Sequence, residues 1–263
     1  MKKYFEGYYY KHQKGENVLC IIAGKSNSGE FIQVITKDFS CNIPYIGDNI
    51  FSQKGFKLNI KTEELSLQGE ISYENLTPLK YDIMGPFKYI PMQCRRGIVS
   101  MHHRLNGKVV LNGDVIDFTD GIGYIEKDSG RSFPSKYVWI QANDFSDKSS
   151  IMVSVAKIPF TGLYFRGCIC VIIYEGREYR FATYLGAKII SCTKNEVILK
   201  QGRYKLTVKI KERPGHKLIA PNMGEMTRDI VESVSSTAEF SFYSKDKLIF
   251  HKTSNHTSFE FEA

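Results

Sequence analysis

The sequence lacks the features that mark several large classes of protein. Its apolar stretch CICVIIY is too short to cross a bilayer, and the opening MKKYFEGYYYKHQ reaches charged residues before a secretory signal could form. It contains no GxSxG, P-loop or HExxH motif, and DGIGYIE lacks the third glycine of a dinucleotide-binding fingerprint. We therefore expect a cytoplasmic protein that uses none of these chemistries.

The spacing of metal ligands is also missing. The six cysteines include no CxxC pair. Cys168 and Cys170 are two residues apart, so on a strand they point to the same face, and we interpret them as two small buried apolar side chains. His102 and His103 are adjacent and therefore face opposite sides of a strand. We expect reduced thiols and no metal site, because a chain of this length without a secretory start needs no disulfide framework.

Charge limits the partners of the chain without identifying one. The 36 basic and 28 acidic residues give a net charge of +8, spread along 263 residues of which 42% are apolar. No basic helix or nucleic-acid motif accompanies this charge, so we expect no nucleic-acid partner. A general attraction to anionic surfaces, including transient contact with a membrane, is compatible with it. The apolar content is enough to bury a core.

Alternation of apolar and polar residues is the dominant pattern. Residues 55–61, GFKLNIK, and 203–211, RYKLTVKIK, each place apolar side chains on one face and lysines on the other. Such segments recur every 8 to 12 residues with many aromatics, which favours an antiparallel sandwich or barrel. The exception is a helical spacing of Met226, Ile230 and Val234, which predicts one short helix.

Turn signals separate these strands. Asn112 and Gly113 supply the two positive-φ positions of a type I′ turn, which predicts a hairpin that pairs Val110 with Val115. Further hairpins are predicted about Glu175-Gly176, Gln201-Gly202 and Lys245-Asp246. The polar, turn-rich stretch at 143–150 is the expected boundary between two β modules, residues 1–146 and 147–263.

One stretch, GYIEKDSGRSFPSKYVWIQANDF at 123–145, interrupts the alternation. It places a cluster of opposite charges beside aromatic residues and Trp139, the only tryptophan of the chain. One interpretation is structural, a buried ion-pair cluster that joins the modules, with Trp139 as a core residue. The other is chemical, since burial raises the pKa of a carboxyl and aromatic faces attract cations. Such an acid could protonate an alkene and shelter the resulting cation.

Three segments resemble a known family. YFEGYYYKHQ at 4–13 is similar to its YFEGWYFK opening, 123–145 is similar to its EKNWG-x-x-FP-x-x-W-x-W-x-Q-x-N-x-F signature, and 218–243 resembles its late L-x-AP segment. The order and spacing agree from residue 4 to about 243. The family is tocopherol cyclase with its bacterial relatives.

The resemblance implies an all-β fold, two lipocalin-like antiparallel β-barrel modules packed together. For the plant enzymes it implies a cycloisomerisation without a cofactor: an acid protonates a prenyl double bond of a hydroquinone, and the phenolic oxygen closes on the cation. The chain departs from the family where Tyr8, Ser129 and Tyr137 stand in place of tryptophan and Asp128 in place of asparagine.

Two functions follow as hypotheses. The first is a tocopherol cyclase-like isomerase that acts on a prenylquinol or a similar amphipathic polyene, and the second is a lipocalin-like protein that binds a hydrophobic or prenylated small molecule without catalysis. The candidate proton donors are Glu126, Asp128 and Glu6. The expected substrate-binding residues are Tyr8, Lys127, Arg131, Phe133, Tyr137, Trp139, Gln141 and Asn143.

Overall fold

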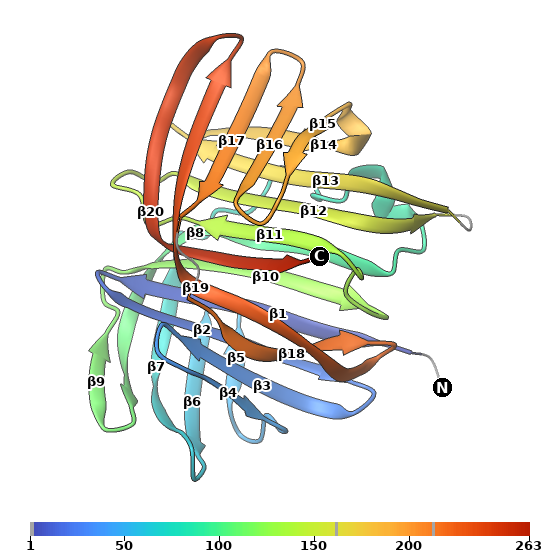
Figure 1. Cartoon of the computed structure of the whole chain (residues 1–263). Helices are drawn as coiled ribbons and strands as arrows, with labels where there is room; N and C mark the ends of the chain where they lie inside the picture. Colours follow the sequence, from blue (N-terminus) through green and yellow to red (C-terminus); the bar gives the residue numbers. More distant parts are fainter. Residues whose placement is uncertain (1–2, 161–162, 212–213) are drawn as a thin grey trace. The chain divides into compact units, whose positions relative to one another are not determined.

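A computed structural model of the chain describes residues 3–160, 163–211 and 214–263 (Figure 1). Strands dominate it, and the described helices are two short 3-10 turns, η1 at Gly85–Tyr89 and η2 at Thr183–Leu185. The strands form two ten-stranded antiparallel sheets. The all-β class predicted from alternation is therefore confirmed.

The first sheet has the order β4-β3-β2-β1-β10-β8-β7-β6-β5, and β9 pairs with β8. Its described ends are the short strands β4 and β5, and β1 lies at its centre between β2 and β10. The strands are β1 Phe5–Lys14, β2 Asn17–Ser26, β3 Gly29–Thr36, β4 Ser40–Ile43, β5 Ile50–Ser52, β6 Gly55–Lys61, β7 Ser66–Glu74, β8 Cys94–Leu111, β9 Asp114–Asp117 and β10 Ile122–Gly130.

The second sheet has the order β14-β13-β12-β11-β20-β19-β17-β16-β15, and β18 pairs with β19. It repeats the topology of the first sheet: there the last strand, β10, returns to pair with β1, and here the last strand, β20, returns to pair with β11. The strands are β11 Tyr137–Ala142, β12 Ser150–Phe160, β13 Leu163–Tyr174, β14 Arg177–Ala182, β15 Lys188–Cys192, β16 Glu196–Gln201, β17 Tyr204–Ile210, β18 His216–Asn222, β19 Glu225–Ser244 and β20 Lys247–Glu262.

The chain forms two compact units whose segments alternate along the sequence. Unit 1 comprises Met1–Asp82, Cys94–Ser132 and Leu218–Asp229, and unit 2 comprises Ile83–Gln93, Phe133–Lys217 and Ile230–Ala263. The polar stretch at 143–149 connects β11 with β12, which are antiparallel neighbours within unit 2. The module bounds 1–146 and 147–263 stay a prediction.

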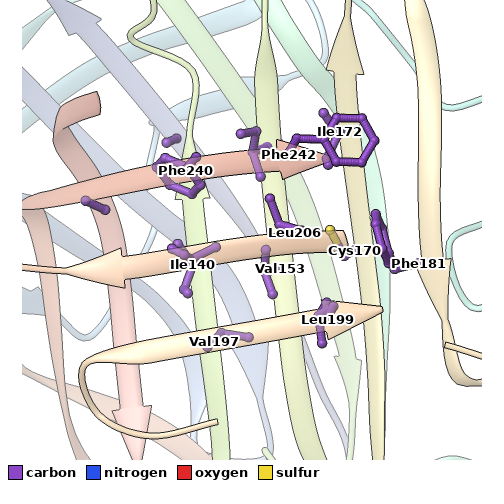
Figure 2. Close-up of a cluster of buried hydrophobic side chains, with 14 of the residues drawn as sticks. Ile140, Val153, Cys170, Ile172, Phe181, Val197, Leu199, Leu206, Phe240 and Phe242 are labelled. Atoms are coloured by element: carbon purple, nitrogen blue, oxygen red, sulfur yellow. The ribbon is translucent and has the colours of Figure 1, made fainter. Parts of the chain in front are cut away.

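Each unit has its own hydrophobic core. In unit 1 the inward side chains of the first sheet form it, including Leu19, Ile21, Val34 and Leu67, all of them inaccessible to solvent. In unit 2 aromatic rings pack among aliphatic side chains of several strands (Figure 2). Phe242, for example, contacts the rings of Phe181, Tyr204 and Phe250. Burial of these side chains is the main stabilising contribution to each unit.

The predicted hairpins are present. Val110 pairs with Val115, and Asn112 and Gly113 have φ values of 51° and 97°, as a type I′ turn requires. The hairpins about Glu175-Gly176 and Lys245-Asp246 also form as predicted, whereas the third has Gly202-Arg203 as its loop residues, one position later than the predicted Gln201-Gly202.

The predicted helix at 226–234 is wrong. These residues belong to β19, a strand of 20 residues that pairs with three other strands. Ile230, Val234 and Ser236 are buried there. The spacing of four that suggested a helix is also a multiple of two, so it fits one face of a strand equally well.

The six cysteines are free thiols in the structure. Across the described residues, no group of three or more histidine, cysteine or acidic side chains could hold a metal ion. Nor does any helix in the described part of the chain have the length and apolar character to cross a membrane.

Candidate functional site

The central strands β1 and β10 position the predicted site residues of unit 1. Glu126 on β10 lies opposite Tyr9 on β1, and Lys127 lies opposite Tyr8. Because side chains alternate across a strand, Glu126 and Asp128 share one face while Lys127 points to the other. This arrangement divides the predicted residues of unit 1 into two groups.

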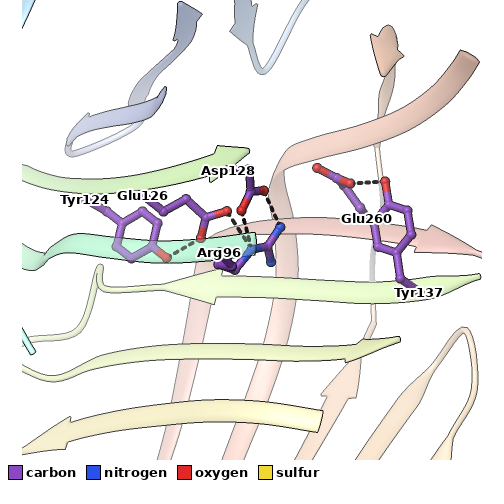
Figure 3. A network of polar contacts seen from close by, with 6 residues as sticks. All are labelled: Arg96, Tyr124, Glu126, Asp128, Tyr137 and Glu260. Carbon is purple, nitrogen blue, oxygen red and sulfur yellow. Dashed lines mark hydrogen bonds and ion pairs between the residues drawn. The ribbon is translucent and has the colours of Figure 1, made fainter. Parts of the chain in front are cut away.

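The first group is a buried network of two carboxyls and one guanidinium (Figure 3). Arg96, from β8, donates from Nε to Asp128 Oδ1 at 3.0 Å and from Nη2 to Asp128 Oδ2 at 2.7 Å. The same Nε lies 3.3 Å from Glu126 Oε1. The hydroxyl of Tyr124 donates to Glu126 Oε2 at 2.5 Å. Glu126 and Asp128 are 3% and 8% exposed, so these contacts form away from bulk water.

Burial and charge act on this network in opposite directions. Burial lowers the pKa of Arg96, but the charges of Asp128 and Glu126 outweigh it and hold that pKa well above its usual value. The pKa of Tyr124 is raised well above 10, first by burial and then by the adjacent Glu126 charge. The guanidinium and the phenol therefore keep their protons, and Tyr124 remains a hydrogen-bond donor to Glu126.

The second group lies on the opposite face of the same strands. Lys127 Nζ is 2.9 Å from Glu6 Oε2 and 5.0 Å from the centre of the Tyr8 ring. Glu6 also accepts a hydrogen bond of 2.8 Å from the Tyr4 hydroxyl. Burial raises the pKa of Glu6, but the bonds from Lys127 and Tyr4 outweigh it and lower the value below 4.5. Glu6 is therefore ionised at neutral pH.

A pocket of about 320 Å³ opens beside Glu6. Aromatic rings form part of its wall, since Tyr10 stacks with Tyr8 at 6.0 Å and with Phe51 at 5.7 Å between ring centres. The pocket thus combines flat apolar walls with the carboxylate of Glu6. Arg131, by contrast, is exposed, and its backbone carbonyl accepts a hydrogen bond of 2.6 Å from Gly224 N.

The remaining predicted residues belong to unit 2. Tyr137, Trp139 and Gln141 share one face of β11, while the alternate side chains of that strand join the hydrophobic core. Trp139 is 1% exposed and Gln141 is fully buried, as is Asn143 just after the strand. Phe133 packs edge-on against Tyr137, with ring centres 6.0 Å apart.

Two carboxyls of unit 2 were missed by the sequence reasoning. Glu260 on β20 is the register partner of Trp139 and accepts a hydrogen bond from the Tyr137 hydroxyl (Figure 3). Glu232 on β19 is in turn the register partner of Glu260. Direct partners share a face of the sheet, so both carboxyls lie on the Trp139 side; Glu260 is 7% exposed and Glu232 is 0% exposed. The alternation in SFEFE was the available signal, but β20 follows β11 by more than 100 residues.

A third polar cluster lies in the core of unit 1, around two neutral histidines. His12 Nδ1 donates to the carbonyl of Leu19 at 2.9 Å, so its Nε2 accepts from the Tyr73 hydroxyl at 2.7 Å. The ring of His103 lies 4.7 Å from that of Tyr73. Burial lowers the pKa of His12 to about 4 and that of His103 to about 3.

Comparison with solved structures shows the fold. The chain is similar to CghA in complex with Sch210972, with a TM-score of 0.63 at 7% identity over 99% of this chain and 89% of that one. It is also similar to kievitone hydratase from Nectria haematococca, with a TM-score of 0.55 at 11% identity over the same shares. The lipocalin-like fold expected from the sequence is therefore confirmed.

Comparison of sequences shows the family. A curated relative, described as a probable chloroplastic tocopherol cyclase of Oryza sativa subsp. japonica, is 30% identical over 132 residues. The match covers 44% of this chain and only 27% of the rice protein. The family model described as tocopherol cyclase-like matches residues 71–261, which is most of the sequence. The chain belongs to the tocopherol cyclase-like family.

Proposed function

We propose that this protein is a cyclase-like isomerase that closes a ring in a prenylated hydroquinone or a similar amphipathic polyene. A carboxylic acid donates its proton to one alkene carbon, and the phenolic oxygen then forms a C–O bond to the adjacent cationic carbon. The phenolic proton returns to a base, so substrate and product are isomers. The step balances without an oxidant, a reductant or a further reactant.

The observation that carries the proposal is the Tyr124–Glu126–Arg96–Asp128 network. General acid catalysis at neutral pH requires a carboxyl that retains its proton. Burial disfavours a carboxylate, and a second negative charge close by disfavours it further. Glu126 is 3% exposed and shares the single charge of Arg96 with Asp128, so two buried carboxyls face one guanidinium and can hold one proton between them. We assign Glu126 as the proton donor.

Aromatic side chains support the same assignment. Tyr9 lies directly across the strand pair from Glu126, and Tyr124 contacts it through its hydroxyl. The faces of such rings attract a cation more strongly when the site excludes water. Glu6 is a poorer donor, because its lowered pKa leaves it ionised.

The test is cyclisation of a panel of prenylated hydroquinones, followed by chromatography, with ligand binding measured separately. Glu126→Gln should keep the fold and the ligand affinity and lower turnover by about 100-fold or more, the usual contribution of a positioned acid. Glu70→Gln, at an exposed glutamate of β7, is the matched control and should leave turnover unchanged. Equal turnover by Glu126→Gln and wild type would refute the assignment.

Glu260→Gln is the informative second variant. Glu260 is the register partner of Trp139 in unit 2 and, like Glu126, accepts a hydrogen bond from a tyrosine hydroxyl. If Glu260→Gln loses turnover and Glu126→Gln does not, the proton donor lies in unit 2 and the reaction class is retained. If neither variant changes turnover, both carboxyls are structural.

A second candidate function is ligand binding without catalysis. The observation that favours it is the ion pairing itself, because Arg96 contacts both carboxyls and would hold them as a structural cluster. On this account the wild-type protein binds compounds of the panel and returns them unchanged. Native mass spectrometry of protein purified from its own host identifies the bound compound in either case.

A further inference from the structure

The β12–β13 hairpin of unit 2 extends beyond the strands on both sides of it. Pairing with β11 stops at Ala156 on β12, and pairing with β14 starts at Ile169 on β13. Among the described residues, 158–159 and 163–166 therefore have no strand partner except each other, and Figure 1 shows the described part of the hairpin reaching past β11. The described residues at this end thus form a two-stranded ribbon with no third strand beside it.

Large apolar side chains lie exposed on this ribbon. Leu163 is 75% exposed and Tyr164 is 62% exposed. The turn η1 lies against the same strand, because its Phe87 stacks on Phe165 with ring centres 6.2 Å apart. Tyr89, two residues further on, is 80% exposed.

The turn η2 adds a fourth exposed apolar residue. Phe87 also contacts the ring of Tyr184 at 6.1 Å, and the Tyr184 hydroxyl donates to the carbonyl of Ile83 at 2.9 Å. Leu185 follows and is 44% exposed. A group of exposed apolar residues that gathers on one projecting end marks an interaction surface, unlike single apolar residues scattered over a protein.

The charge of this end has one sign. The segments 83–93, 157–159, 163–167 and 183–190 contain lysines and an arginine and no acidic residue. Lys157 lies with its Nζ 4.2 Å from the centre of the Tyr164 ring and is the register partner of Arg166. Lys88 lies over the ring of Tyr89 at 4.8 Å. Basic groups thus accompany the exposed rings.

We propose that this end of unit 2 docks on a lipid bilayer that carries anionic headgroups. We call it the docking tip and define it by Lys88, Tyr89, Lys157, Leu163, Tyr164, Arg166 and Leu185. Tyrosine rings favour the depth of the headgroups, leucine enters the acyl boundary, and lysine extends its charge back to the phosphates. The proposal is independent of whether the protein is an enzyme.

Charge decides between a bilayer and a second copy of the chain. A dimer through this surface would bring the basic residues of two copies together, and like charges across an interface are unfavourable. An anionic bilayer complements the same residues, and each basic residue near its surface strengthens binding about fivefold at low salt. Contact at one small tip also fits a reversible association.

The experiment is flotation of the full chain with vesicles. One vesicle preparation is phosphatidylcholine alone, and the other contains phosphatidylglycerol as well. We expect wild type to float with the anionic vesicles and to lose this binding as salt is raised. Failure of wild type to bind anionic vesicles at low salt would overturn the proposal.

Variants locate the contact. Leu163→Ser and Tyr164→Ser should each lower binding about tenfold, the loss expected when one large apolar side chain no longer leaves water. Lys157→Gln should lower it about fivefold and weaken the salt dependence. The matched controls lie in unit 1, Val115→Ser at a residue 66% exposed and Lys54→Gln at an exposed lysine, and both should bind like wild type.

Two outcomes contradict the proposal even if wild type floats. Equal binding by Leu163→Ser, Tyr164→Ser and wild type would place the membrane contact elsewhere. A dimer in solution that Leu163→Ser dissociates, without any effect on vesicle binding, would identify the tip as an interface between copies. Circular dichroism of each variant checks that the fold is unchanged.

Discussion

Acid should destabilise unit 1 through its two buried histidines. His12 and His103 have pKa values lowered from 6.5 to about 4 and about 3, first because burial disfavours their charged forms. The unfolded chain therefore binds protons below pH 6.5 that the folded unit does not. The stability that depends on the neutral rings is complete above pH 6.5, and it is lost as pH falls toward 4.

The magnitude follows from the difference between the two titrations. Between pH 8 and pH 5, a histidine with an unfolded pKa of 6.5 and a folded pKa near 4 contributes a loss of ~2 kcal/mol. His103 contributes a similar ~2 kcal/mol over the same interval. The sum of ~4 kcal/mol is a large part of the 5 to 15 kcal/mol that stabilises an ordinary domain. Carboxyls with ordinary pKa values add little above pH 5, and measuring the slope in Glu126→Gln as well removes the contribution of the proposed proton donor.

The assay has to report on unit 1 alone. Trp139 belongs to unit 2, so its fluorescence follows that unit and serves as the internal comparison. Hydrogen exchange of peptides from β1 and β10, measured at a series of urea concentrations and pH values, gives the opening free energy of unit 1. We expect it to fall by ~4 kcal/mol between pH 8 and pH 5 in wild type.

Variants separate the histidines from other causes. His103→Asn cannot titrate in this range, so about half of the pH dependence should disappear, whatever stability the substitution itself costs. The control is His251→Asn, at an exposed histidine of β20, which should keep the full dependence. An unchanged slope in His103→Asn would refute the reasoning.

Two further predictions concern packing. Trp139→Ala should lower the free energy of unfolding, measured by urea denaturation, by ~3 to 5 kcal/mol because Trp139 is 1% exposed. Trp139→Phe should cost less. A loss below ~1 kcal/mol in Trp139→Ala would mean that the indole is not a core residue. Gly24→Ala should cost ~1 to 3 kcal/mol, because its new Cβ would lie 2.3 Å from the carbonyl oxygen of Glu6. Gly97→Ala, whose Cβ would lie 3.8 Å from its nearest neighbour, should be close to neutral, and equal losses at both glycines would contradict the steric explanation.

The parts of the fold that depend on local sequence could be predicted. Asn112 and Gly113 determine a turn, and the turn determines that Val110 lies opposite Val115, because pairing in a hairpin starts from its loop. The alternation of side chains along a strand likewise places Glu126 and Lys127 on opposite faces. Neither inference requires knowledge of any residue far away in the chain.

The partners of the candidate acid could not be predicted. Arg96 reaches Asp128 because β8 pairs with β10, and that pairing contains register shifts between Gly123 and Glu126. A shift of one residue moves a side chain to the opposite face, so no counting along the sequence identifies which residue of β8 faces Glu126. Glu260, the register partner of Trp139, could not be found by counting either, because more than 100 residues separate β11 from β20.

The alternation of the two units along the chain affects how the protein is made. The last segment of unit 1, Leu218–Asp229, is synthesised about 100 residues after Ser132, which is roughly 5 to 20 s later at ordinary ribosome speeds. Until then Gln33 lacks the Ile219 carbonyl to which its amide donates at 2.9 Å, and the Arg131 carbonyl lacks Gly224 N. The nascent unit 1 therefore waits without its last segment and without these two hydrogen bonds, and during this interval a chaperone or a second unfolded chain could bind it.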